Sequence, residues 1–182
     1  MIDDLHLNWS GPYSYRELLS NQQNWNQFAK PGIYLHTERS PDSGVRLCYV
    51  GMAGGRPNLM VRQVRHYLGA VGLLYYLEPK LTRRRRSPKN TEAFREAIAC
   101  AFDEEKFVHL VRDRFAYASR IQVYLAPHAQ RLNEIEYTLI RKWSNEYPEG
   151  LQNIRGKRAR KRLTLLNIQH APQDPPWMAG NT

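Results

Sequence analysis

Two tyrosines, an arginine and a histidine combine side-chain chemistry and spacing that suit an anionic substrate. Tyr34 ends a Gly-Ile-Tyr tripeptide, and Tyr49 begins a Tyr-Val-Gly tripeptide. Arg62 and His66 follow four residues apart, so on a helix they share one face. A guanidinium can donate two hydrogen bonds to phosphate oxygens, and phenols and an imidazole can transfer protons. These four side chains are therefore candidates for chemistry on an anion.

Two strands and a helix are predicted to position them. Each tripeptide predicts a short strand, and Pro-Asp-Ser-Gly at 41–44 predicts the turn between the strands. After a glycine-rich turn at 51–55, a helix is predicted around 58–68, with Gly69 as its stop. Arg62 and His66 are expected to point away from the apolar stripe of this helix. That stripe consists of Met60, Val64, Tyr67 and Leu68.

A carboxylate falls inside an apolar stripe further along the chain. The helix predicted at 130–143 carries Glu136 within its stripe and Glu134 on the opposite face. Burying a carboxylate without a partner costs several kcal/mol, so Glu136 requires a cation or hydrogen-bond donors. It could lie at the stripe's margin, pair with a buried arginine, or bind a hard divalent cation such as Mg²⁺. The apolar stripe consists of Leu132, Ile135, Leu139, Ile140 and Trp143.

Other elements follow from caps and periodicity. Ser-Tyr-Arg-Glu at 14–17 is a capping box and predicts a short helix in the polar leader. A helix is predicted to start after Thr91, with Phe102 on its core face, and further helical turns at 107–111. Alternating apolar residues over 115–125 predict a strand that Pro127 ends.

Composition places the chain among globular, nucleic-acid-facing proteins. Its 182 residues suit one domain, and a hydrophobic content of 42% supports a real core. Lys and Arg number 27 against 17 acidic residues, a net charge of +10 that favours nucleic acid or an anionic membrane surface. No apolar run approaches the roughly 20 residues that span a bilayer. An acidic start and only two cysteines predict a cytoplasmic protein without a secretory signal or disulfide framework.

The order of these motifs resembles the GIY-YIG nuclease family. Both tripeptides, the Arg-x-x-x-His pair and a Glu in an apolar helix occur in that order between about residues 31 and 153. The resemblance implies an α/β fold with a small, mostly antiparallel central sheet flanked by helices. It also implies that Glu136, followed by Leu139 and Ile140, is the metal ligand. Met52 departs from the family, where many members have Lys or Ser at that position.

The family also has an Asn after the metal-binding Glu that supports the active site. Asn153 is the expected counterpart, and Asn145 and Asn167 are alternatives. The expected domains are an N-terminal helical leader at 1–30, a catalytic domain at 31–154 and a basic, proline-rich tail at 155–182. The distance between the Arg-His pair and the Glu exceeds that of compact members, which suggests a basic insertion around 78–112.

The resemblance implies a metal-dependent DNA endonuclease that uses Mg²⁺ or Mn²⁺, with restriction or defence as the expected role. In this interpretation Arg62 binds phosphate and Tyr34 is the general base. Tyr49 and His66 position the reactants, and His66 is an alternative base. A repair or homing nuclease, a non-catalytic nucleic-acid-binding module on the same fold, and a basic RNA-associated protein remain alternatives. A symmetric double-strand cut would favour a homodimer.

Two basic runs are expected to follow the nucleic-acid backbone. Their members are Arg83, Arg84, Arg85, Arg86, Arg155, Lys157, Arg158, Arg160 and Lys161.

Overall fold

The computed structural model describes residues 4–40, 44–71, 102–146 and 166–170. The chain divides into two compact units. The first contains Met1–Gln63 with Arg120–Thr182, and the second contains Val64–Ser119. The first unit carries the sheet and most of the candidate site residues.

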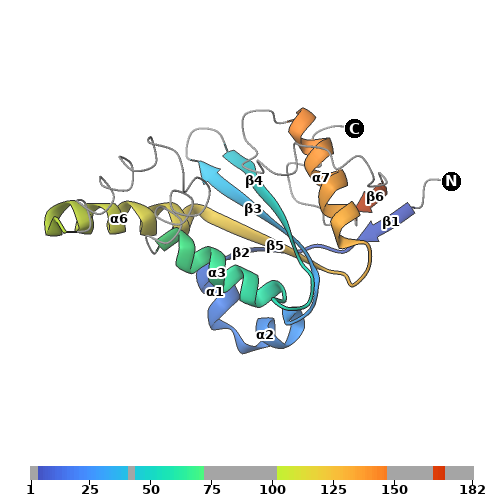
Figure 1. The fold of residues 1–182 in the computed structure, drawn as a ribbon, viewed down its shortest axis with the longest axis horizontal. Helices are drawn as coiled ribbons and strands as arrows, with labels where there is room; N and C mark the ends of the chain where they lie inside the picture. The colour runs from blue at the N-terminus through green and yellow to red at the C-terminus, as the bar shows by residue number, and fades with distance from the viewer. Residues whose placement is uncertain (1–3, 41–43, 72–101, 147–165, 171–182) are drawn as a thin grey trace, which may run out of the picture. The chain divides into compact units, whose positions relative to one another are not determined.

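A four-stranded antiparallel sheet forms the centre of the first unit (Figure 1). Its strands, in spatial order, are β2 (Ser10–Ser14), β5 (Ile121–Pro127), β3 (Gly32–Ser40) and β4 (Gly44–Ala53). The predicted α/β class with a small, mostly antiparallel central sheet is confirmed. So is the predicted pair of neighbouring strands, because β3 and β4 form one hairpin.

The two faces of the sheet have different roles. Ile33 and Leu35 of β3 are fully buried and pack with α7 (Leu132–Glu146) in one apolar cluster. Burying each such side chain contributes roughly 1.5–3 kcal/mol. Successive side chains of a strand alternate between faces, so Tyr34 and His36 lie on the face opposite α7. All five residues of the predicted apolar stripe of α7 are buried, as expected.

The first 30 residues contain strands as well as helices. The capping box is confirmed, because the Ser14 hydroxyl accepts from the Glu17 amide (3.1 Å) and Glu17 accepts from the Ser14 amide (2.8 Å). Helices α1 (Tyr15–Ser20) and α2 (Gln22–Phe28) follow. The leader is not helical alone, since β2 is an edge strand of the central sheet. The sequence did not predict β2 because it contains a Gly-Pro pair, although an edge strand tolerates proline.

A small parallel pair joins two distant parts of the chain. β1 (Asp4–Leu7) pairs with β6 (Asn167–His170), and Figure 1 shows this pair beside α7. Just before β6, Leu166 is buried and its amide donates to the Thr138 hydroxyl of α7 (3.2 Å). This part of the predicted C-terminal tail therefore belongs to the fold.

Helix α3 (Leu59–Val71) differs from its predicted form. It runs through Gly69 instead of ending there, and Leu68 of its predicted stripe is 50% exposed. Met60 of that stripe is fully buried, as predicted, and the other fully buried side chains are Leu59 and Gln63, which lie outside the predicted stripe. The helix is thus rotated from the predicted orientation, and a polar side chain occupies the core position that the apolar pattern left unassigned.

The predicted strand at 115–125 is wrong in its first half. Helix α6 (Glu104–Arg120) includes the predicted helical turns at 107–111 and continues to the start of β5. Two acidic residues in its first turn and Arg120 in its last suit the helix dipole. Alternation over so few residues does not separate a strand from a helix face. Phe102, expected on a core face, is 87% exposed.

Several predicted elements lie outside the described residues. They are the basic run at 83–86, the helix over 91–101, the basic run at 155–162 and the proline-rich end. Within the described ranges, no helix is both long and apolar enough to cross a membrane.

Candidate active site

The glycines of both tripeptides are required by close packing. A Cβ on Gly51 would collide with the ring and hydroxyl of Tyr34. A Cβ on Gly32 would lie 2.5 Å from the Ala126 carbonyl oxygen and 2.7 Å from Leu59 Cδ1. Tyr34 can therefore lie across β4 only because residue 51 has no side chain. Gly32 in turn lets α3 and β5 approach the start of β3.

The two phenols meet on the sheet face opposite α7. Tyr34 is opposite Gly51 in the β3–β4 register and has no exposed surface. Its ring stacks on that of Tyr49, with centroids 6.0 Å apart and planes at 23°. The two side chains also form a hydrogen bond. Tyr49 lies on the edge strand and is half-buried, so it is the more accessible phenol.

Helix α3 brings Arg62 to the phenols. The Leu59 amide donates to the Lys30 carbonyl (2.9 Å), which ties the start of α3 to the residues just before β3. Asn58 caps the helix, because its side chain accepts from the Val61 amide (2.9 Å). With its first turn fixed in this way, α3 places the Arg62 charge where it lowers the pKa of both Tyr34 and Glu136.

Glu136 reaches the same place from the other side of the sheet. β4 is an edge strand, and the Met52 backbone amide donates a hydrogen bond to the Glu136 carboxylate. Burial raises the pKa of Glu136, and Arg62 and the Met52 amide only partly oppose that rise. Glu136 therefore has the partners that its place in an apolar stripe required. We call Tyr34, Tyr49, Arg62 and Glu136 the edge site.

Burial keeps the Tyr34 phenol protonated. It raises the pKa of Tyr34 well above the usual 10.0, and the neighbouring Tyr49 raises it further. Arg62 acts in the opposite direction, while the Glu136 carboxylate again disfavours a phenolate. At neutral pH Tyr34 is thus a neutral hydroxyl, suited to donating a hydrogen bond.

Two further polar side chains, to which the sequence assigned no role, lie beside the phenols. His36 and Gln63 are both buried, and His36 Nε2 lies 2.7 Å from Gln63 Oε1. His36 contacts both phenol rings, with centroids 5.3 Å from Tyr34 and 5.8 Å from Tyr49. The available signals were the position of His36 two residues after Tyr34 and that of Gln63 beside Arg62.

The remaining predicted site residues lie in other parts of the chain or outside the described residues. His66 lies one turn beyond Arg62, in the second unit. Asn153 and both basic runs lie outside the described residues. Asn167 donates to the Asp4 carboxylate (2.6 Å) across the β1–β6 pair, and Asn145 lies near the end of α7. Their roles stay predictions.

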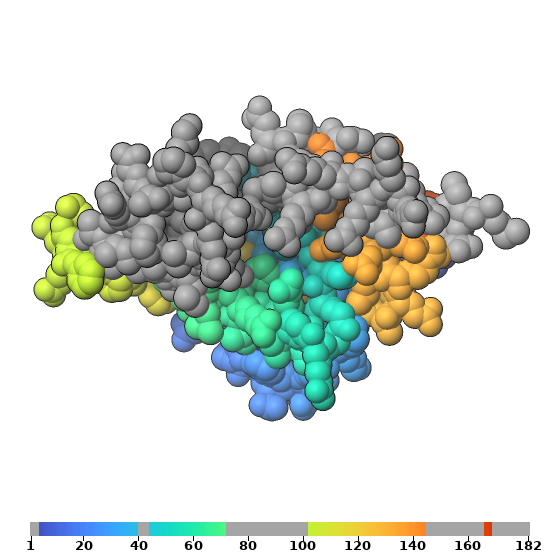
Figure 2. All heavy atoms as spheres, viewed as in Figure 1, coloured from blue at the N-terminus to red at the C-terminus, as the bar shows by residue number. Residues whose placement is uncertain are grey.

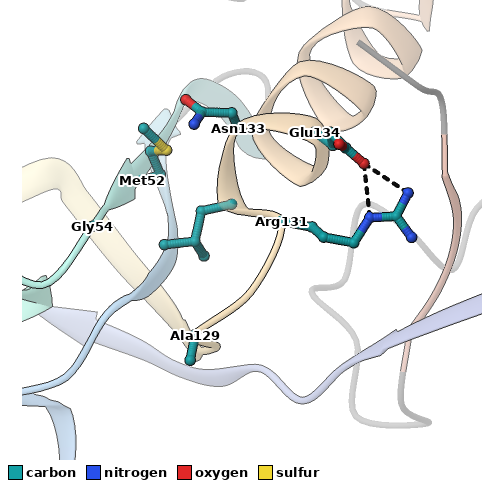
Figure 3. Close-up of a pocket in the computed structure, with 7 residues that line it drawn as sticks. Met52, Gly54, Ala129, Arg131, Asn133 and Glu134 are labelled. Carbon is teal, nitrogen blue, oxygen red and sulfur yellow. Dashed lines mark hydrogen bonds and ion pairs between the residues drawn. The ribbon is translucent and has the colours of Figure 1, made fainter.

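A pocket of about 390 Å³ lies between the end of β4 and the start of α7. Figure 2 shows the atoms of these two segments side by side, in cyan and orange. In Figure 3 the Arg131 guanidinium donates to Glu134 from two nitrogens, each 2.7 Å from the same oxygen. Glu134 therefore pairs with Arg131 and not with Arg62. The pocket is lined by Met52, Gly54, Ala129, Arg131, Leu132, Asn133 and Glu134.

The donor set of the edge site fits Mg²⁺ bound with substrate. Among the described residues, no three His, Cys, Asp or Glu side chains gather into a metal cluster. Mg²⁺ commonly binds through one or two carboxylates, several waters and substrate phosphates. Glu136 offers one half-buried carboxylate, and a bound cation would oppose the burial that raises its pKa.

Comparison with known proteins identifies no relative. The chain matches no protein-family model, no curated protein and no solved structure.

Proposed function

We propose that this protein is a metal-dependent DNA endonuclease of the GIY-YIG type, serving restriction or defence. The observation that carries the proposal is the meeting of Tyr34, Arg62 and Glu136, from three separate elements, at the edge of β4. A phenol, a guanidinium and a half-buried carboxylate in electrostatic contact are the groups that phosphodiester hydrolysis requires.

Each residue has a distinct role in the proposed reaction. Arg62 binds the scissile phosphate through two hydrogen bonds, which a lysine could not reproduce. Glu136 would hold Mg²⁺ or Mn²⁺, which would supply positive charge to stabilise the reacting phosphate. His66 follows Arg62 on α3 and is assigned to proton relay, while Asn153 is assigned to supporting the site.

The burial of Tyr34 argues against the expectation that it is the general base. A base must give up its proton near neutral pH, and the raised pKa of Tyr34 opposes this. We assign proton transfer to Tyr49, which is more accessible. A hydrogen bond donated by the Tyr34 hydroxyl stabilises the anionic form of its acceptor, so Tyr34 would assist Tyr49 from the buried side.

DNA binding is assigned to the basic runs at 83–86 and 155–162. Their sequence-independent contacts would track the phosphate backbone, in keeping with a net charge of +10. They would hold the substrate without reading its sequence.

The test is cleavage of supercoiled plasmid with titrated Mg²⁺, using Glu136→Gln and Arg62→Lys. Each variant is expected to lose about 10²–10³-fold in kcat. Glu134→Gln is the matched control, because it removes a carboxylate two residues away that pairs with Arg131. Tyr49→Phe should lose more activity than Tyr34→Phe. Equal binding of DNA by wild type and all variants, with no cleavage of DNA or RNA, would establish the non-catalytic alternative instead.

A further inference from the structure

His36 is a buried titratable group that the proposed reaction does not use. It lies on β3, on the same face as Tyr34, and pairs with Tyr49 across the hairpin. Its ring also contacts that of Tyr15 of α1, with centroids 5.8 Å apart. Burial lowers the pKa of His36 to about 4, so the imidazole is neutral at physiological pH. It therefore fills the space between aromatic rings without adding charge.

Gln63 connects this imidazole to the helix of Arg62. It is fully buried on α3, immediately after Arg62, and its Oε1 lies 2.7 Å from His36 Nε2. A neutral imidazole that carries its proton on Nε2 donates to that oxygen. Within the part of the chain that the structure describes, Gln63 Nε2 has no hydrogen-bond partner.

A buried amide donor without a hydrogen-bond partner lowers the stability of the folded protein. An apolar residue would fill the same space without leaving an amide group unpaired. The hydrogen bond does, however, fix one geometric relation. It joins β3, which carries Tyr34, to the turn of α3 that carries Arg62.

We propose that His36 and Gln63 are positioning residues, whose hydrogen bond fixes Arg62 relative to the two phenols. This inference rests on the proposed function, because positioning matters only where Arg62 and a phenol act on one phosphate. The pair touches neither substrate nor metal in this scheme and acts through Tyr34, Tyr49 and Arg62.

The kinetic test compares single and double variants. His36→Leu, Gln63→Leu and the double variant should each lose about 10²-fold in kcat with little change in KM for DNA, since misplacement by about 1 Å has that effect. The double variant should be no worse than either single one, because both remove the same bond. His36→Gln, which can present a donor at a similar position, should recover most of the activity.

Thr37→Val is the matched control. Thr37 is fully buried on the same strand, and within the described residues its hydroxyl has no hydrogen-bond partner. It should therefore retain wild-type kcat. Removing both members of a hydrogen-bonded pair is nearly neutral for folding, so the double variant should unfold at the wild-type denaturant midpoint. Wild-type kcat in the double variant, an equal loss in Thr37→Val, or an unfolded double variant would each overturn the inference.

A second measurement does not depend on nuclease activity. Nitrogen NMR of wild type should show the His36 proton on Nε2, and the double variant should shift the Cζ resonances of Tyr34 and Tyr49. If wild type cleaves no nucleic acid, the proposed function fails, and these spectra alone decide the geometry. Unchanged tyrosine resonances would then refute the positioning role.

Discussion

Replacing Gly51 with alanine tests the close packing on which the edge site depends. The new Cβ would collide with the ring and hydroxyl of Tyr34, a side chain that is fully buried. Because the ring cannot move into solvent, the strain must be absorbed by the core. Overpacking of this kind costs about 1–3 kcal/mol. In a chain of this size the melting temperature should fall by roughly 2–12 °C.

Gly54→Ala is the control that isolates this collision. A Cβ on Gly54 would meet no atom within 4 Å. Both substitutions reduce the freedom of the unfolded chain by a similar amount, so the difference between the two variants measures the clash. Urea unfolding monitored by circular dichroism gives both stabilities. If Gly51→Ala is as stable as Gly54→Ala, Tyr34 does not lie across residue 51 and the described site geometry is wrong.

Three further predictions concern charge. Without metal, Glu136→Gln should be more stable than wild type at pH 7 in urea unfolding, because burial makes the ionised carboxylate unfavourable. This gain in stability should accompany the expected loss of cleavage. A lower stability than wild type would contradict the prediction. His36 has a folded pKa near 4 against about 6.5 when unfolded, so the unfolded chain alone gains a proton between these values. The free energy of unfolding should therefore fall by up to about 3 kcal/mol as pH drops from 6.5 to 4, and His36→Phe should flatten that slope. If six phosphates are contacted, log K for DNA binding should fall against log salt concentration with a slope of roughly −5. Changing all four arginines at 83–86 to Gln should make that slope shallower. An unchanged slope would show that this run does not contact the phosphates.

The sequence was informative where local pattern and packing agree. The β3–β4 hairpin follows from two short strands around a turn, and the stripe of α7 follows from five apolar residues at helical spacing. The same rotation placed Glu136 among apolar neighbours and required the partners that Arg62 and Met52 provide. These features depend on residues close together in the chain.

The missed features depend on contacts that a local pattern does not contain. β2 contains Gly and Pro, and it is a strand because β5 pairs with it from more than 100 residues away. The alternation before Ile121 fits a helix face as well as a strand, and helix prevails there. Gln63 is polar, so an apolar stripe could not reveal its burial, and its partner His36 lies on another element.

The pairing of β1 with β6 determines when this part of the fold can form during synthesis. Asp4 and Asn167 are 163 residues apart, so β1 has no strand partner until those intervening residues have been made. At about 5–20 residues per second, ribosomal synthesis of that length takes roughly 10–30 s. Throughout that time Leu7 lacks the cover that Leu166 and Ile168 later provide. The nascent chain therefore leaves β1, with its apolar Leu5 and Leu7, unpaired for that time, during which a ribosome-associated chaperone could bind it.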